Sequence, residues 1–574
     1  MQPLRKGTWP GPARWQGLLP AAGLGVAAAL ALPVLTVAAS VLQRTAEEIT
    51  EFLRLVLPRY VANTLWLLAG VGAGTAVVGV GTAWLVSRYR FPGHRLAEGL
   101  LLLPLAVPAY LLAYTYADLL QYSGPVQSAL RAWLGWERGY PFPEVRSLGG
   151  AVFVLTFVLY PYVYMLARAA FLDQSAGVLE VSRTLGHGAA STFFRVALPL
   201  ARPGIVAGLT LAGMEVLADF GTVKYFELDT LATGVYLVWF SFGSVVGAGK
   251  LAACLMGFVV LLVALERLSR GRRRFDPLPS RGRPAADHLR GFRGFAALGA
   301  CLLPPALGFG VPGGYLLWMA WWHGDPLWGP AFVRFAQNTF VLAASAAALA
   351  VVVATVLAYG LRLSPTPLMR FVARVVSLGY AVPGVVVAVG ILVPFGWVDN
   401  ALDVWARRWL GLSTGLVLSG TAATLVYAYL VRFLAVSLNT VEAGLSRIRP
   451  TLEGAARTLG HGPASVLVRV HAPLLRGSVF TAALLVFVDA LKELPATLVL
   501  RPFNFDTLAV RVYLLASDER LAQASTAGLC IVAVGLLPVL LLNRAVARSR
   551  EVASQPPSAV PGSTARVDVR SEFA

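Results

Sequence analysis

Two pairs of acidic residues stand inside hydrophobic stretches of the chain, where a carboxylate is costly to bury. Glu215 is followed by Asp219, and Asp489 is followed by Glu493. Each pair has the spacing i, i+4, which places both side chains on one face of a helix. One offset relates the two pairs, because 489 − 215 and 493 − 219 both equal 274. We therefore expect up to four carboxylates around a central path that suits a cation.

A structural role for these acids is the alternative. Lys492, Lys224 or an arginine from a loop could neutralise them, or they could stand at the wet ends of their helices. Substitution of Asp219 and Glu493 by Asn and Gln separates the two hypotheses, because only the pathway hypothesis requires cation transport to fall.

No pattern in the chain indicates catalysis. The segment 411–415 matches G-x-S-x-G, but no strand–turn–helix context surrounds it. The pair Gly249-Lys250 fails the phosphate-loop pattern, because Leu251 follows the lysine. The three cysteines have no metal-ligand spacing. We expect no enzyme, no metal site and no cofactor in this chain, so any ATP is hydrolysed by another polypeptide. A membrane enzyme is the weakest hypothesis.

The elements that carry these residues are membrane-spanning helices. Hydrophobic residues make up 57% of the chain and charged residues 13%, whereas a soluble domain has about a quarter charged. The apolar residues come in blocks of about 20, the length that crosses a bilayer as a helix. The predicted fold is an all-α polytopic membrane protein of about twelve transmembrane helices. The spans are predicted at 17–42, 62–87, 97–121, 149–171, 203–222, 245–265, 295–321, 338–361, 372–397, 414–437, 477–499 and 524–544. Prolines in 97–121 and 372–397 predict kinked or broken spans.

Arginines gather on one side of these spans. Their segments are Arg88–Arg95, Arg168–Arg202, Arg267–Arg293, Arg362–Arg374, Arg432–Arg476 and Arg544–Arg550. The opposite loops are more acidic or mixed. The positive-inside rule therefore places both termini in the cytoplasm of a multi-pass inner (plasma) membrane protein.

The chain is duplicated. The string RTLGHG occurs at 183–188 and again at 457–462, and Pro199 and Pro473 follow at equal distances. Asn63-Thr64 likewise matches Asn338-Thr339, and Val107-Pro108 matches Val382-Pro383. We predict two parallel repeats of six helices, related by a pseudo-two-fold axis along the membrane normal.

The repeat divides the chain into four predicted regions. They are a first half at 1–265, an arginine-rich cytoplasmic linker at 266–294, a second half at 295–550 and a disordered cytoplasmic tail at 551–574. Each half contains one polar loop that faces the cytoplasm, at 179–202 and at 452–476.

The first polar loop resembles the EAA loop of ATP-binding-cassette (ABC) importer permeases. Glu180 begins it, a glycine follows at 186, and Val196-Ala197-Leu198-Pro199 ends it. The second copy departs from the pattern, because Gly454 stands in place of the glutamate and Glu453 lies one position earlier. In that family the loop is a helix, a glycine turn and a second helix, and it docks on a separate ATPase subunit. The resemblance assigns this role to Glu180, Arg183, Gly186, His187 and Pro199, and to Glu453, Arg457, Gly460, His461 and Pro473.

The fusion of two permease halves resembles the ferric-iron importer permeases of the type I ABC importers. Residues 217–236 and 492–521 carry the local likeness to the iron group. The resemblance implies two copies of a cytoplasmic ATPase, a periplasmic or extracellular solute-binding protein and surrounding membrane lipid as partners, and no nucleic acid. Permeases for thiamine and for oxyanions such as sulfate and molybdate stay open as alternatives. An ion-coupled secondary transporter with twelve spans is the alternative from another class.

Overall fold

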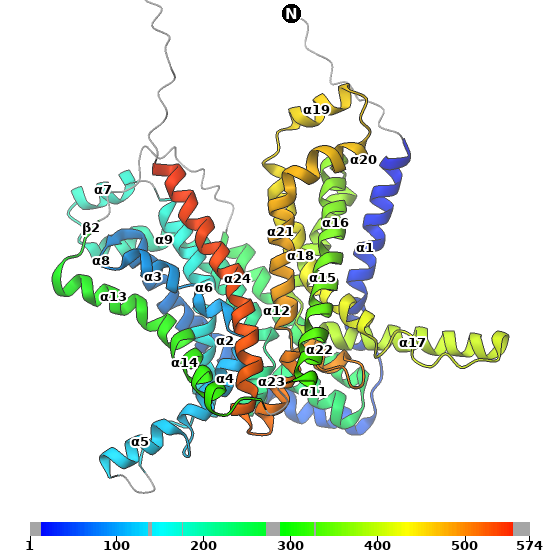
Figure 1. The fold of residues 1–574 in the computed structure, drawn as a ribbon, viewed down its shortest axis with the longest axis horizontal. Coiled ribbons are helices and arrows are strands. Elements are labelled where there is room, and N and C mark those ends of the chain that lie inside the picture. Colours follow the sequence, from blue (N-terminus) through cyan, green and yellow to red (C-terminus); the bar gives the residue numbers. More distant parts are fainter. Residues whose placement is uncertain (1–12, 136–139, 175, 271–286, 326–328, 555–574) are drawn as a thin grey trace, which may run out of the picture.

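The computed structural model describes residues 13–135, 140–174, 176–270, 287–325 and 329–554. These residues are almost wholly helical (Figure 1). The only β structure among them is one short parallel pairing of β1 (Tyr89–Arg90) with β2 (Asp287–His288).

The helices before the linker are α1 (Ala13–Ser40), α2 (Glu47–Arg88), α3 (His94–Leu100), α4 (Ala109–Leu120), α5 (Pro125–Leu134), α6 (Leu148–Leu172), α7 (Ala176–Thr184), α8 (Ala189–Thr192), α9 (Leu198–Ala218), α10 (Gly221–Tyr225), α11 (Leu231–Phe242) and α12 (Val245–Arg270). Short 3₁₀ and π-helical turns, η1 (Leu103–Ala106) and η2 (Phe193–Ala197), join some of them.

The helices after the linker are α13 (Gly291–Pro305), α14 (Val311–Trp322), α15 (Pro330–Leu363), α16 (Pro367–Leu378), α17 (Gly384–Leu410), α18 (Ala422–Ser446), α19 (Pro450–Thr458), α20 (Pro463–Val466), α21 (Ala472–Leu491), α22 (Pro495–Leu500), α23 (Leu508–Ser517) and α24 (Leu521–Ser554). The connecting turns are η3 (Ala306–Gly310), η4 (Gly379–Ala381) and η5 (Leu467–His471).

The predicted set of spans matches these helices closely. In the described part of the chain, 11 helices are long and apolar enough to cross a membrane, and one bent pair raises the number to 12. The bent pair, His94–Ala106 with Ala109–Leu134, turns by 94°. The prediction of about twelve transmembrane helices is therefore confirmed.

The two spans with predicted breaks are interrupted at equivalent prolines. Pro108 lies between η1 and α4, and Pro383 lies between η4 and α17. The preceding residues, Val107 and Val382, are extended, with ψ of 125° and 120°. Steric conflict with the proline ring disfavours helical backbone at the preceding residue. The predicted span 372–397 is consequently divided between α16 and α17.

The first helix of each half packs on the other half. The hydroxyl of Tyr427 in α18 donates a hydrogen bond to the carbonyl of Ala29 in α1. In the reverse direction, the hydroxyl of Tyr315 in α14 donates to Asp118 in α4 at 2.7 Å. The contact of α1 with α18 and the contact of α14 with α4 therefore both join the two halves.

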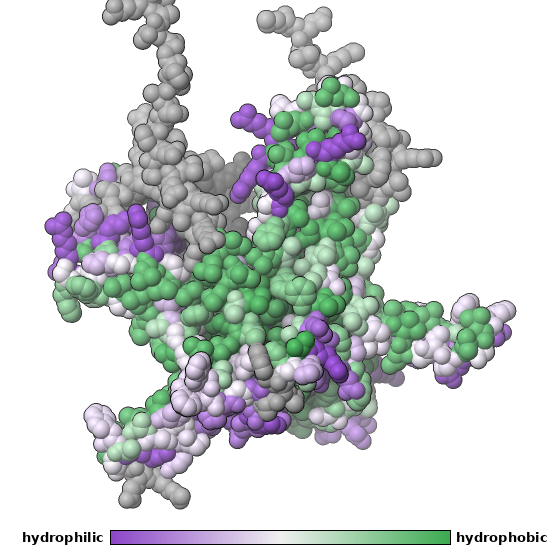
Figure 2. Space-filling model, in the orientation of Figure 1, coloured by the Kyte–Doolittle hydropathy of each residue, from purple (hydrophilic) through white to green (hydrophobic). Residues whose placement is uncertain are grey.

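Different helices lie at the two opposite ends of the molecule (Figure 1). The helices of the two predicted coupling loops, α7 with α8 and α19 with α20, lie at one end. The short helices α11, α22 and α23 lie toward the other end, and α5 and α17 project sideways there. Figure 2 shows apolar surface between polar residues at the two ends, as expected for a protein that spans a bilayer.

Candidate functional site

A cavity of about 130 Å³ lies between the two halves, and all four predicted carboxylates line it. Glu215 and Asp219 come from the end of α9, and Asp489 and Glu493 come from the end of α21. The two proline breaks also border this cavity, through Pro108 and neighbours in the first half and through Tyr380 of η4 in the second. The repeat thus brings equivalent segments of both halves to one place.

The carboxylates do not share one continuous helix face, so that part of the sequence prediction is wrong. Helix α9 ends at Ala218, and Asp219 is extended, with ψ of 128°. Its carboxylate accepts hydrogen bonds from the backbone N–H groups of Thr222 at 3.0 Å and Val223 at 3.2 Å. Asp219 therefore caps the short helix α10, whose first N–H groups have no partner within the helix.

Glu493 performs the same task in the second half. Helix α21 ends at Leu491, and the Glu493 carboxylate accepts from the backbone N–H groups of Ala496 at 3.1 Å and Thr497 at 3.2 Å. These groups open helix α22. The second acid of each pair thus ends up beyond a helix break, because it satisfies the N–H groups that follow.

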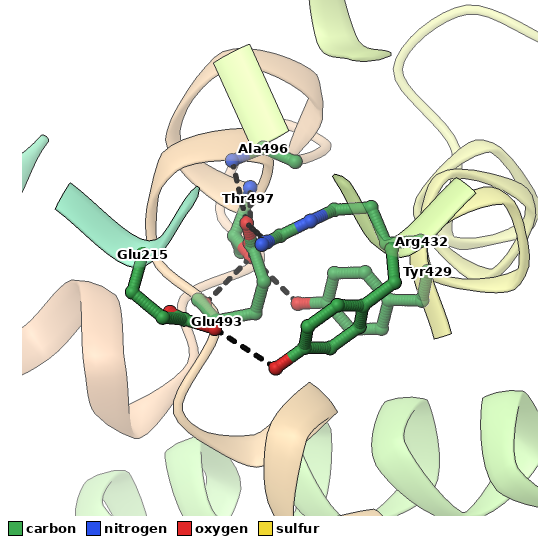
Figure 3. A network of polar contacts seen from close by, with 7 residues as sticks. Glu215, Tyr429, Arg432, Glu493, Ala496 and Thr497 are labelled. Atoms are coloured by element: carbon green, nitrogen blue, oxygen red, sulfur yellow. Dashed lines mark hydrogen bonds and ion pairs between the residues drawn. The ribbon is translucent and has the colours of Figure 1, made fainter. Parts of the chain in front are cut away.

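Two cations neutralise the acids of the second half, and Figure 3 shows one of these contacts, between Arg432 and Glu493. Arg432 extends from α18 to Glu493, with an Nη1–Oε1 distance of 2.7 Å, and their side chains are 11% and 1% exposed. Lys492 pairs with Asp489 at 3.0 Å. Lys492 is thus a neutralising cation of the kind that the structural alternative named, at Asp489.

From the sequence, Arg432 was counted with the cytoplasmic arginines although it falls within the predicted span 414–437, and the first of these placements is wrong. The residue lies inside α18, beside the cavity, because the buried Glu493 supplies the charge that a buried guanidinium requires. An arginine within the predicted span 414–437 was the available signal.

Glu215 is held differently, by a contact between the halves. The hydroxyl of Tyr380 in η4 donates to Glu215 Oε1 at 2.8 Å. Among the described residues that line the cavity, four are carboxylates and two, Arg432 and Lys492, are cations. Both cations are paired with acids of the second half, so the cavity carries an excess of negative charge on the side of Glu215 and Asp219.

The two predicted coupling loops have the helix–turn–helix form that the resemblance implied. Gly186 and Gly460 follow α7 and α19 with φ of 82° and 84°. This left-handed conformation is costly for residues with a Cβ atom, and it ends helices at glycine. In both loops the next N–H, from His187 or His461, donates to a carbonyl five residues earlier at 3.1 Å.

The histidine rings of both loops make local contacts. His187 Nδ1 shares a hydrogen bond with the Ser191 hydroxyl at 3.1 Å, and His461 Nδ1 does so with Ser465 at 3.2 Å. Pro199 and Pro473 each stand at the second residue of the long helix that follows, α9 or α21. Each proline lies inside a longer helix, Ala189–Ala218 or Pro463–Leu491, directly after a π-helical turn, η2 or η5, that accommodates its missing N–H.

The acids of the two loops face different surroundings. Glu180 is exposed, whereas Glu453 is buried and pairs with Arg362 at 3.1 Å and with Arg457 at 2.8 Å. Gly454, at the position equivalent to Glu180, is exposed with open space around its Cα. The side chain of Arg183 lies outside the described residues. The second loop thus uses its glutamate to fasten α19 to α15, and presents no acid where the first loop does.

Comparison with known proteins identifies this architecture. The family model "Binding-protein-dependent transport system inner membrane component" matches twice, over residues 75–269 and 350–552. The "Fe(3+)-transport system permease protein FbpB 2" of Haemophilus influenzae is 26% identical over 492 residues, which cover 84% of this chain and 89% of that protein. The "Molybdenum transport system permease protein ModB" of the same organism is 29% identical over 213 residues, covering 36% of this chain and 85% of that protein.

A solved bacterial ABC transporter involved in alginate import aligns with 44% of this chain at 19% identity, with a TM-score of 0.36. The twofold family match, over more than half of the chain, confirms the predicted pair of homologous halves. It also excludes the ion-coupled secondary transporter, because members work with a solute-binding protein and with an ATPase that is a separate subunit. This chain belongs to the family of binding-protein-dependent transport system inner membrane components, and it is a fused permease subunit of an ABC importer.

Proposed function

We propose that this chain is the permease of a ferric-iron importer. The observation that carries the proposal is the charge of the cavity between the halves, which four carboxylates and two cations line. The relative that covers 84% of this chain is named as an Fe(3+) permease, and this supports the same substrate here.

The excess negative charge favours a cation over an oxyanion. At roughly 6 Å and an effective dielectric constant of about 20, one carboxylate repels a unit negative charge by about 3 kcal/mol. Glu215 and Asp219 have no cation partner among the ion pairs of the described residues, so both repel an anion in the cavity. Repulsion of this size opposes the entry of molybdate or sulfate into the cavity at every transport cycle. The same carboxylates attract Fe³⁺.

The side chains that line the cavity suit an ion that passes through it better than an ion that is held there. No group of three or more His, Cys, Asp or Glu side chains in the described residues is arranged to hold a metal ion. Transported ions must bind weakly enough to leave. Selection of the metal therefore belongs to the solute-binding protein, and the permease supplies an electrostatic path.

The hydrogen bond from Tyr380 to Glu215 serves as a gate contact in this proposal. It joins η4 of one half to α9 of the other, at the broken spans. Rigid-body separation of the halves breaks it and exposes the Glu215 carboxylate to the passing ion.

The two loops at 179–202 and 452–476 transmit ATP-driven motion to these helices. In our proposal, two copies of the ATPase dock on the turns at Gly186 and Gly460 from the cytoplasm, where both termini also lie. The leucines before these glycines, Leu185 and Leu459, are 72% and 78% exposed and provide apolar contacts for docking. Because only the first loop presents an exposed glutamate, the two ATPase contacts are unequal.

The ligand of the solute-binding protein encoded beside this chain tests the substrate. Metal analysis and calorimetry of that purified protein are expected to show Fe³⁺ binding. A ligand of thiamine, molybdate or sulfate would overturn the iron assignment while leaving the permease assignment in place.

A further inference from the structure

Helix α17 carries an arm that leaves the body of the protein. Its first residues, from Gly384 to Ile391, are buried, whereas its distal part projects sideways, crosswise to the long helices α15 and α21 (Figure 1). The equivalent segment of the first half, α4 with α5, is interrupted between Leu120 and Pro125.

Internal hydrogen bonds fasten the arm to the chain that returns from it. The Asp399 carboxylate accepts from the backbone N–H groups of Val417, Leu418 and Ser419 at 2.7–3.1 Å. One turn later, Asp403 accepts from Ser413, Thr414 and Gly415 at 2.8–3.3 Å. The acids of this segment are thus satisfied within the arm, which is a rigid unit of its own.

The other side of the arm is aromatic and uncovered. Trp397, Trp405 and Trp409 are 74%, 55% and 70% exposed, and Val404 is 66% exposed. At 100° per residue the three tryptophans fall within about one third of the helix circumference. By the same count Asn400 falls outside this third. Asp399 and Asp403 face the returning chain, and Arg407 pairs with Asp403 at 2.7 Å.

We propose that this arm lies in the headgroup region of the bilayer, at the face opposite the coupling loops. Tryptophan is enriched at membrane–water interfaces, and an amphipathic helix with such a face lies in the plane of the interface. The arm is continuous with the buried first part of α17, and it projects sideways near the ends of α15 and α21 that lie away from α19 and α20 (Figure 1). The exposed cation Arg408 is placed to meet lipid phosphates.

This placement connects the lipid surface with the cavity. A Cβ atom on Gly384, at the first residue of α17, would meet Glu493 Oε1 at 2.5 Å and Arg432 Nη1 at 3.1 Å. One helix therefore abuts the Arg432–Glu493 pair at one end and rests on lipid at the other. The arm fixes the depth and tilt of α17 relative to the bilayer while the halves move.

Spin-label depth measurements on the full chain test the proposal. The permease is placed in nanodiscs of phosphatidylethanolamine and phosphatidylglycerol, with its three native cysteines replaced by alanine. A nitroxide is attached at W405C, and the matched control N400C lies on the same arm but on another face. We expect the ratio of oxygen to nickel-chelate accessibility to be severalfold higher at position 405 than at 400.

Equal and water-like ratios at both positions would overturn the proposal. So would a label at 405 that is exposed to nickel chelate in lipid and becomes protected only when the solute-binding protein is added, because the face would then be a protein docking site. A second measurement keeps the native cysteines. Brominated lipids are expected to quench wild-type tryptophan fluorescence more strongly than that of the variant W397F/W405F/W409F, and equal fractional quenching would contradict the placement.

Discussion

Loss of the Arg432 side chain tests the electrostatics of the site most sharply. Glu493 is 1% exposed, and its carboxylate accepts from Arg432 and from the first N–H groups of α22. The substitution Arg432→Met keeps the side-chain length but leaves a buried carboxylate without its cation. Breaking a buried ion pair in this way costs about 3–5 kcal/mol.

The chain provides a matched control and a rescue. Lys492 and Asp489 form the other ion pair of the cavity, but their side chains are 29% and 23% exposed, so Lys492→Met is expected to cost about 1 kcal/mol. The double variant R432M/E493Q is expected to recover most of the loss, because a neutral glutamine leaves no buried charge and its one carbonyl oxygen still accepts from the start of α22.

Unfolding of the purified permease by titration with sodium dodecyl sulfate, followed by tryptophan fluorescence, measures these free energies. We expect the order wild type, K492M, R432M/E493Q and then R432M, from most to least stable. The reasoning fails if R432M costs no more than K492M, or if E493Q brings no recovery in the R432M background.

Three further predictions concern transport and coupling. Glu215→Gln is expected to lower iron uptake severalfold with normal membrane insertion, because it removes one of the two carboxylates without a cation partner; unchanged initial uptake rates would contradict this role. Tyr380→Phe is expected to raise ATP hydrolysis in the absence of the solute-binding protein, since it removes the contact between the halves; an unaltered basal rate would argue against a gate there. Gly460→Ala is expected to strain the second coupling turn by about 1–2 kcal/mol and to reduce uptake per ATP hydrolysed. Gly454→Ala, which meets open space, is the control, and equal effects of the two would refute the importance of the turn.

The sequence contained enough information for the spans, the breaks and the position of the acids. Apolar length identified the helices, and the prolines at 108 and 383 marked the interruptions, because both signals are local in the chain. The offset of 274 located two equivalent pairs of acids, and the duplication implied that they meet.

The surroundings of three cavity residues could not be predicted, because they depend on contacts that no local sequence pattern contains. The i, i+4 spacing of Glu215 and Asp219 suggested one helix, but Asp219 gains more by capping α10, and the helix ends before it. Arg432 was counted with the cytoplasmic arginines although it falls in the predicted span 414–437, and only its buried partner explains its position. Tyr380 has no sequence signal, because its role arises from the approach of the two halves.

The sequence also did not predict that the first helix of each half packs on the other half, or that the distal part of α17 projects sideways. Tyr427 and Ala29 are 398 residues apart, so their contact reflects the packing of one half on the other. The distal part of α17 falls between the predicted spans at 372–397 and 414–437 and was predicted as a loop, whereas the structure makes it a helix whose three tryptophans fit the interface.

ATP-dependent uptake by proteoliposomes tests the central claim most directly. The complex of this permease with its ATPase is reconstituted, and radioactive Fe³⁺, molybdate and sulfate are each supplied with the solute-binding protein. We predict uptake of iron that requires ATP and the binding protein, with no accumulation of either oxyanion. Accumulation of molybdate or sulfate, or iron uptake that persists without ATP, would contradict a cation path driven from the coupling loops.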